Sequence, residues 1–183
     1  LETIDPEQAI DRALETYLKK GYTEEWVHQR LLAIRIRNEL TDEWQKRGVE
    51  KGKEYAILTD EITRAWAGMS TGQYKRLKGL KKENLRDNMS DLELVLTMLA
   101  EASTADISKV EKPQGFSESQ KVARRGGKVA GVARQALEAE TGKPVITAQN
   151  AESFRQLVTD IVEDAAALPE NTEADKSDGK KED

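Results

Sequence analysis

Between Lys75 and Arg86 the chain carries a dense block of basic residues that could bind a polyanion. Six of these twelve positions are cations and one is an anion, so the local charge is +5 in a chain whose net charge is −5. Lysine and arginine side chains that neutralise phosphates release counterions, which makes binding strongly salt-dependent. Charge separated in this way can attract a polyanion to one surface while the rest of the molecule repels it. This basic block consists of Lys75, Arg76, Lys78, Lys81, Lys82 and Arg86.

The residues beside the basic block suggest two interpretations of it. Tyr74 directly precedes the block and could stack on an exposed base of a single-stranded nucleic acid. The alternative is a solvated charged face, which is the commoner role of a charge run. In that case Leu77, Leu80 and Leu85 only anchor a connecting segment to the core.

A second basic patch lies later in the chain, where no acidic residue occurs from Gln120 to Gln135. Small residues recur there at helical spacing, including Gly127 and Gly131. Glycine in a helix interior costs about 1 kcal/mol relative to alanine, so its presence needs a reason. One reason is close approach to a helix of this chain or of a second copy; the other is a helix break at Gly126 that leaves a backbone nest for an anion. The cations of the second patch are Lys121, Arg124, Arg125, Lys128 and Arg134.

The sequence contains no recognisable catalytic or metal-binding motif. The chain has no cysteine and one histidine, His28, so it cannot build a zinc site from Cys and His ligands at fixed spacing. Carboxylates cluster at expected helix starts and outer faces, where the helix dipole and solvation explain them. Gly126-Gly127-Lys128 does not fit the GxxxxGK[ST] phosphate loop, and no strand precedes it. We therefore expect a protein that is not an enzyme and binds no metal or cofactor.

Composition indicates a soluble, helix-rich protein with a modest core. Of 183 residues, 34% are charged, 37% hydrophobic and 5% aromatic, and this length corresponds to one domain. No apolar run approaches the roughly 18–20 residues that span a bilayer, and no signal peptide is apparent. We expect a cytoplasmic protein with no membrane partner. Because the chain begins at Leu1, we also expect a fragment of a longer protein.

Helix signals dominate the chain and predict an all-α single domain of six or seven helices. The helix with the clearest sequence signals follows Ser90, which is predicted to cap it, and Glu93 is predicted to complete a capping box. Its wide apolar face places this helix centrally, because such a face is usually buried on more than one side. The face consists of a stripe at Leu92, Val95, Leu96, Leu99 and Ala100, which Leu94 and Met98 broaden. The other expected helices cover 6–20, Thr23 to Trp44, Thr59 to Gly68, Ser70 to Lys78, Ser117 to Glu140, and a last one from Thr147 that carries Phe154, Leu157, Val158, Ile161 and Val162.

The predicted domain covers residues 1–167, and a disordered tail of mixed charge covers residues 168–183. From Pro169 onward the only apolar residue is one alanine. Such a segment cannot bury enough apolar surface to offset the entropy of ordering it.

Short stretches spread over residues 24–154 resemble the C-terminal region of the bacterial DNA-damage-inducible protein D family and related phage BRO or antirepressor-like proteins. The most specific is Lys78-Gly79-Leu80-Lys81-Lys82, followed by Met89 and the helix after it. Family members usually carry an N-terminal BRO-type domain thought to bind DNA, which this sequence does not include. The other matching stretches are Arg35-Ile36-Arg37-Asn38-Glu39-Leu40-Thr41, Tyr55-Ala56-Ile57-Leu58, Leu92-Glu93-Leu94 and Arg124-Arg125-Gly126-Gly127-Lys128-Val129-Ala130.

The resemblance implies a non-enzymatic regulator in the bacterial DNA-damage (SOS) response or in phage regulation. It would act on DNA or on a DNA-bound protein, for which the recombinase filament is one candidate. The alternative is an α-helical dimerisation or docking module that forms a homo-oligomer or binds another protein, and never binds nucleic acid. A pI near 5.2 favours that alternative, because dedicated duplex binders are usually basic. The predicted binding residues are Tyr74, the six cations of the basic block, Lys121, Arg124, Arg125 and Lys128.

Overall fold

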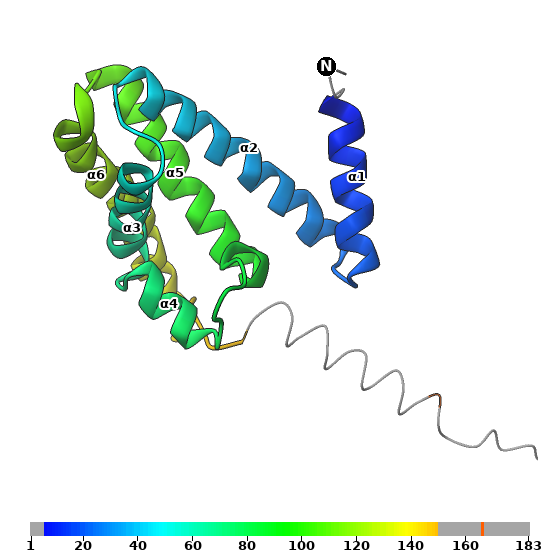
Figure 1. Ribbon diagram of the computed structural model, residues 1–183. Helices are drawn as coiled ribbons and strands as arrows, with labels where there is room; N and C mark the ends of the chain where they lie inside the picture. The colour runs from blue at the N-terminus through cyan, green and yellow to red at the C-terminus, as the bar shows by residue number, and fades with distance from the viewer. Residues whose placement is uncertain (1–5, 150–165, 167–183) are drawn as a thin grey trace, which may run out of the picture.

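The computed structural model describes residues 6–149 and 166, and the regular structure in residues 6–149 is helical throughout, with no strand (Figure 1). The predicted all-α fold class is confirmed. None of the described helices is long and apolar enough to cross a membrane. The elements are α1 (Pro6–Lys19), α2 (Glu24–Lys46), α3 (Lys53–Ala67), α4 (Thr71–Leu77), the short 3-10 helix η1 (Arg86–Asn88), α5 (Asp91–Glu111) and α6 (Gly115–Thr141).

Helix α5 occupies the centre of the fold, as its predicted wide apolar face suggests. It packs against α2 and α6 along much of its length and against α3 over a shorter stretch. Figure 1 shows that α1 stands apart from the other helices and meets them at the start of α2. Helix α4 lies below α3 in this view. The helices share one core whose largest fully buried side chains include Trp44, Trp66 and Tyr74.

Helix α6 approaches its neighbours so closely that there is no room for a side chain at three of its glycine positions. A Cβ on Gly126 would lie 2.5 Å from the Cα of Thr104 in α5, and one on Gly131 would lie 2.5 Å from the carbonyl oxygen of Ala65 in α3. A Cβ on Gly127 would meet α3 as well. Close packing within this chain is therefore the reason for the glycines. The alternative of a helix break at Gly126 is wrong, because α6 is continuous there.

Local sequence signals place most helix starts correctly but miss one. Thr23 caps α2 as predicted, its hydroxyl accepting from a backbone N–H of the first turn at 3.2 Å. Helix α3, however, begins at Lys53 rather than at Thr59. Gly52 allows the earlier start because its φ of 87° turns the chain into the helix. Thr59 lies inside α3, where its hydroxyl donates to the carbonyl of Tyr55 at 2.6 Å instead of capping.

The capping box predicted for α5 forms only in part. Ser90 accepts a hydrogen bond from the N–H of Glu93 at 3.3 Å, so the cap itself is confirmed. The carboxylate of Glu93 does not return to Ser90, because it turns into the core and binds two residues of the α4 region. A complete box occurs instead at α4, between Ser70 and Gln73.

Helix α5 buries part of the predicted apolar face together with polar residues. Of that face, Leu94, Leu96, Met98 and Ala100 are buried, whereas Leu92, Val95 and Leu99 are 40%, 42% and 38% exposed. The buried face includes a polar stripe whose members form hydrogen bonds inside the protein, which makes their burial tolerable. This stripe consists of Glu93, Thr97, Glu101, Thr104 and Ser108.

Several predictions concern residues that the structure does not describe. Nearly all of the predicted helix from Thr147 and the predicted tail from 168 to 183 lie outside the described residues. Residues 147–149 are described and are not helical.

Candidate functional site

The structure separates the basic block into three environments. Three of its cations are exposed and make no ion pair with another described residue, two line a cavity, and one is buried beside Tyr74. In order, these are Arg76, Lys81 and Lys82 on the surface, Lys75 and Arg86 at the cavity, and Lys78 with Tyr74 in the core.

The buried residues form a network at the start of α5. The hydroxyl of Tyr74 and the ammonium of Lys78 both donate to the carboxylate of Glu93, and Lys78 Nζ lies 2.7 Å from Oε1. Lys78 also donates to the carbonyl of Gln149. Burial, reinforced by the negative charge of Glu93, raises the pKa of the Tyr74 phenol and keeps it a neutral donor. Neither side chain reaches the surface, so the structure contradicts the roles predicted for Tyr74 as a base-stacking ring and Lys78 as a phosphate ligand.

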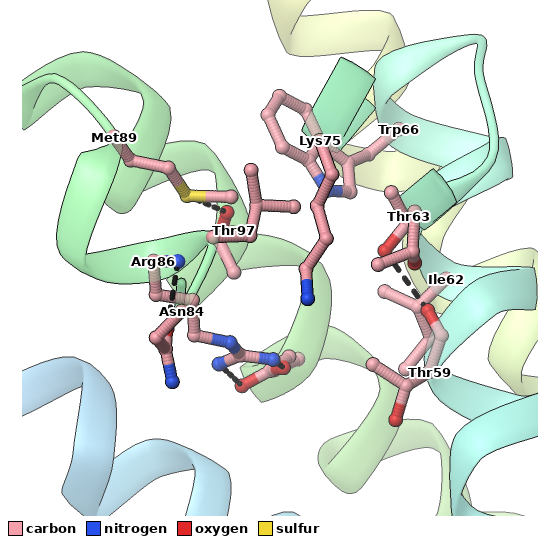
Figure 2. A pocket seen from close by; sticks show the side chains of 12 residues that line it. Thr59, Ile62, Thr63, Trp66, Lys75, Asn84, Arg86, Met89 and Thr97 are labelled. Carbon is pink, nitrogen blue, oxygen red and sulfur yellow. Dashed lines mark hydrogen bonds and ion pairs between the residues drawn. The ribbon is translucent and has the colours of Figure 1, made fainter. Parts of the chain in front are cut away.

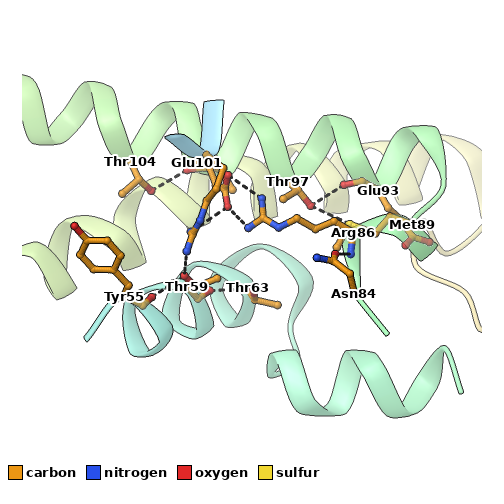
Figure 3. Close-up of polar contacts among 12 residues, drawn as sticks. Tyr55, Thr59, Thr63, Asn84, Arg86, Met89, Glu93, Thr97, Glu101 and Thr104 are labelled. Atoms are coloured by element: carbon orange, nitrogen blue, oxygen red, sulfur yellow. Dashed lines mark hydrogen bonds and ion pairs between the residues drawn. The ribbon is translucent and has the colours of Figure 1, made fainter. Parts of the chain in front are cut away.

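Arg86 turns inward and binds Glu101 (Figure 3). The contact is bidentate, with Arg86 Nη1 3.1 Å from Oε2 and Nη2 on Oε1. Arg37 of α2 shares this carboxylate at 3.4 Å and donates to the hydroxyl of Thr59 at 2.6 Å. Burial lowers the pKa of Arg37, although the charge of Glu101 opposes the shift. The prediction that Arg86 is a freely exposed phosphate ligand is therefore wrong, because its guanidinium is already held inside the protein.

Hydrogen bonds from α1 and α2 hold the last residues of the loop between α4 and α5 in place. Arg30 Nε donates to Asp87 Oδ1 at 2.8 Å, and the Tyr17 hydroxyl donates to the same oxygen at 3.0 Å. The indole nitrogen of Trp26 donates to the carbonyl of Met89 at 3.0 Å. These long-range contacts determine where the chain that carries the exposed lysines enters α5.

A cavity of about 180 Å³ opens between α3, α4, the loop before α5, and α5 itself (Figure 2). Its wall is partly apolar, through residues such as Trp66 and Met89, and partly polar, through threonine hydroxyls and the Arg86–Glu101 pair. Lys75 reaches from α4 into this space, and Figure 2 shows its ammonium with no hydrogen bond drawn to it. Lys75 is the one cation of the basic block that is both half-buried and unpaired among the described residues.

The arginines at the start of the second patch are paired with acids from neighbouring helices. Arg124 binds Glu61 of α3 at 2.9 Å, and Arg125 binds Glu111 of α5 at 2.7 Å. The hydrogen bonds from these arginines lower the pKa of both carboxyl groups. The positive charges of Arg124 and Arg125 are therefore neutralised locally, which weakens the prediction that these arginines bind a polyanion.

The other members of the second patch differ from one another. Arg134 donates to the carbonyl of Trp66 at 2.8 Å and pairs with Glu138 one turn later. Lys121 and Lys128 are exposed and form no ion pair within the described part of the chain. Of the predicted binding residues on α6, these two lysines present unneutralised charge.

Several residues of the cavity wall are missing from the sequence-based prediction. They include Thr59 and Thr63 of α3, together with Thr97 and Glu101 of α5. The two residues of each pair are four positions apart and so lie on one face of their helix. A polar stripe of this spacing within the most apolar helix is the signal that could have identified them.

Among the described residues, no group of three or more His, Cys, Asp and Glu side chains is placed to hold a metal ion. His28 lies on the surface of α2, 3.5 Å from the carboxylate of Glu24. It contacts neither the cavity nor the basic block.

No protein-family model matches the chain, and comparison with curated proteins and with solved structures finds no similar protein. The resemblance to the DNA-damage-inducible protein D family therefore stays a prediction. Function has to be inferred from the chemistry of the basic block and its cavity.

Proposed function

We propose that this chain is a non-enzymatic regulator that binds DNA, or the acidic face of a DNA-bound protein, through the exposed part of the basic block. The observation that carries the proposal is that Arg76, Lys81 and Lys82 form no ion pair with any described residue, while the arginines of the second patch are paired. Lys75 extends the same charged surface into the cavity. The family resemblance supports a role in the bacterial DNA-damage response, with the recombinase filament as a candidate partner.

The arrangement suits contacts with phosphates rather than with base edges. The exposed cations are long, solvated side chains on a seven-residue helix and the following loop. Side chains of this kind position a protein on a nucleic-acid backbone without reading its sequence. Binding would be electrostatic, and its affinity would fall as the salt concentration rises.

Replacing both Lys81 and Lys82 by alanine tests this proposal. We expect weaker binding to DNA of every sequence and a decrease of up to about 2 in the slope of log K against log salt, because each lost phosphate contact removes about one unit. Fluorescence anisotropy with single- and double-stranded oligonucleotides at several salt concentrations measures both quantities. The free energy of unfolding should change by less than about 0.5 kcal/mol, because both side chains are exposed.

The matched control removes two lysines elsewhere. Lys51 and Lys53 are exposed and form no ion pair with a described residue, so replacing both by alanine changes the net charge equally. This control should keep nearly the wild-type affinity and salt slope. If the wild type binds neither DNA nor a DNA-bound filament, or if both double variants bind alike, the basic block is only a solvated face.

A second function, protein–protein association through α5, is favoured by one observation. Leu92, Val95 and Leu99 are exposed at spacings of three and four residues, so they form an apolar stripe on one side of the central helix. Exposed apolar stripes on soluble proteins commonly mark interaction surfaces. The partner in this second function is the same stripe of a second copy of the chain.

The change Leu99→Glu tests this second function. If the stripe mediates dimerisation, sedimentation velocity should show a concentration-dependent dimer for the wild type and a monomer for the variant, because dimer formation would bury a charge in each subunit. Leu32→Glu is the control, since Leu32 is exposed to a similar extent, 39% against 38%, and lies on α2. A monomeric wild type at all concentrations would exclude the dimerisation module.

A further inference from the structure

The cavity beside α4 contains hydrogen-bond donors that have no acceptor within the described protein. The ammonium of Lys75 projects into it without a partner in residues 6–149. The hydroxyl of Thr71 lines it and is buried with no hydrogen bond of good geometry among the described residues, although the Asp60 carboxylate that accepts from the Thr71 N–H at 2.8 Å lies nearby. Asn84 also lines it, and its side-chain oxygen already accepts from the Arg86 N–H at 2.9 Å, which leaves its amide NH₂ as a donor.

The acceptors in the same wall are largely occupied. Glu101 is the carboxylate among the described lining residues, and it already binds Arg86 and Arg37. The hydroxyl of Thr59 accepts from Arg37 and donates to a carbonyl of its own helix. Buried polar groups are normally satisfied, so this surplus of donors indicates a ligand rich in acceptors.

The cavity also carries a net positive charge, which favours an anion among ligands rich in acceptors. Lys75 and Arg86 line the cavity together with Glu101, the single carboxylate among the described lining residues, which leaves an excess of one positive charge. In a half-enclosed site of low dielectric constant, such an excess attracts an anion more strongly than the same charges would in open solvent. The volume of about 180 Å³ exceeds that of several water molecules at about 30 Å³ each, so a small tetrahedral anion fits with room for the atoms bonded to it.

We propose that this cavity binds one phosphate group, with the Lys75 ammonium as its charged ligand and the Thr71 hydroxyl and Asn84 amide as neutral donors. The phosphate is either free inorganic phosphate or a phosphate of a nucleic acid bound at the exposed lysines. In the second case the site deepens the proposed function, and rests on it, because the cavity would hold one backbone or terminal phosphate.

Thermal unfolding in inorganic phosphate, compared with chloride at equal ionic strength, tests the site directly. We expect phosphate to raise the Tm of the wild type, since a ligand that binds only the folded state stabilises it. The change Lys75→Met keeps most of the length of the side chain but removes its charge, and should weaken phosphate binding by about tenfold, the loss expected for one charge-assisted hydrogen bond. Lys75→Arg should retain most of the affinity.

A second measurement follows the site without relying on stability. The indole of Trp66 lines the cavity, so its N–H resonance should shift as phosphate is added and should not shift in Lys75→Met. Lys82→Met is the matched control, because it removes an exposed charge of the same block and should leave both the Tm effect and the Trp66 shift intact. Equal effects of phosphate and chloride on the wild type, or an undiminished phosphate effect in Lys75→Met, would overturn the proposal.

The source of the phosphate is distinguished by three ligands: inorganic phosphate, an oligonucleotide with a 5′-phosphate, and the same oligonucleotide without one. A Lys75-dependent response to inorganic phosphate but to neither oligonucleotide supports a site for the free ion. In that case the proposed DNA function fails while the cavity site is retained. A Lys75-dependent response to an oligonucleotide supports a nucleic-acid phosphate, and a preference for the 5′-phosphorylated form identifies it as terminal. Oligonucleotide binding that requires Lys81 and Lys82 but is unaffected by Lys75→Met retains the proposed function and rejects the cavity site.

Discussion

Replacing Gly126 by alanine is expected to lower the free energy of unfolding by about 3 kcal/mol, the upper end of the range for overpacked cores. The new Cβ would lie 2.5 Å from the Cα and 2.6 Å from the nitrogen of Thr104, besides colliding with its hydroxyl. Side-chain rotation cannot relieve contacts with backbone atoms, so α5 and α6 would have to move apart. The gain in helix propensity, about 1 kcal/mol, is too small to compensate. Urea denaturation followed by circular dichroism measures the change.

Gly72→Ala provides a control of opposite sign. Gly72 is also helical, but it is exposed, and a Cβ there would meet nothing closer than the Arg76 guanidinium at 3.7 Å. Alanine should therefore stabilise the protein by about 0.5–1 kcal/mol through its higher helix propensity. A change of less than about 0.5 kcal/mol for Gly126→Ala would show that the α5–α6 contact is looser than the structure indicates.

The features that sequence predicts correctly are those determined by neighbouring residues. Caps at Thr23 and Ser90 depend on a side chain within hydrogen-bond reach of the next helical turn, so their positions can be inferred from sequence alone. The glycines of α6 could also be interpreted, because glycine inside a helix is unfavourable without a close neighbour. Which helices they contact could not be inferred, because that depends on how α3 and α5 pack.

The candidate site is harder to predict because burial of a charge depends on a distant partner. Nothing in the sequence around Lys78 distinguishes it from Lys81 or Lys82, yet only Lys78 lies within reach of Glu93, fifteen residues away. The pattern of apolar residues in α5 was likewise insufficient, since Leu92, Val95 and Leu99 are exposed while Glu93 is buried. Charge density alone therefore did not identify which cations of the block are available to bind a ligand.

The change Lys78→Met is expected to lower the free energy of unfolding by about 3–5 kcal/mol, the loss typical of breaking one side of a buried ion pair. Methionine fills much of the same space, so a cavity contributes little, and the main cost is the carboxylate of Glu93 left without its cation. The hydroxyl of Tyr74 would still donate to that carboxylate. Loss of the bond from Lys78 to the carbonyl of Gln149 adds to the cost. Chemical denaturation of the variant beside the wild type measures the difference.

Lys82→Met is the matched control, because it removes the same charge from the same block at an exposed position and should change stability by less than about 0.5 kcal/mol. Adding Glu93→Gln to Lys78→Met should recover roughly 1–2 kcal/mol, since the double variant no longer buries an unpaired charge while the new amide oxygen still accepts from Tyr74. The buried network would be disproved if Lys78→Met were as stable as Lys82→Met. If the second substitution instead destabilised the protein further by its full independent cost, Lys78 and Glu93 would not be coupled. Recovery in the double variant would show that Lys78 serves the fold, which leaves Lys75, Arg76, Lys81 and Lys82 as the cations of the block free to bind a ligand.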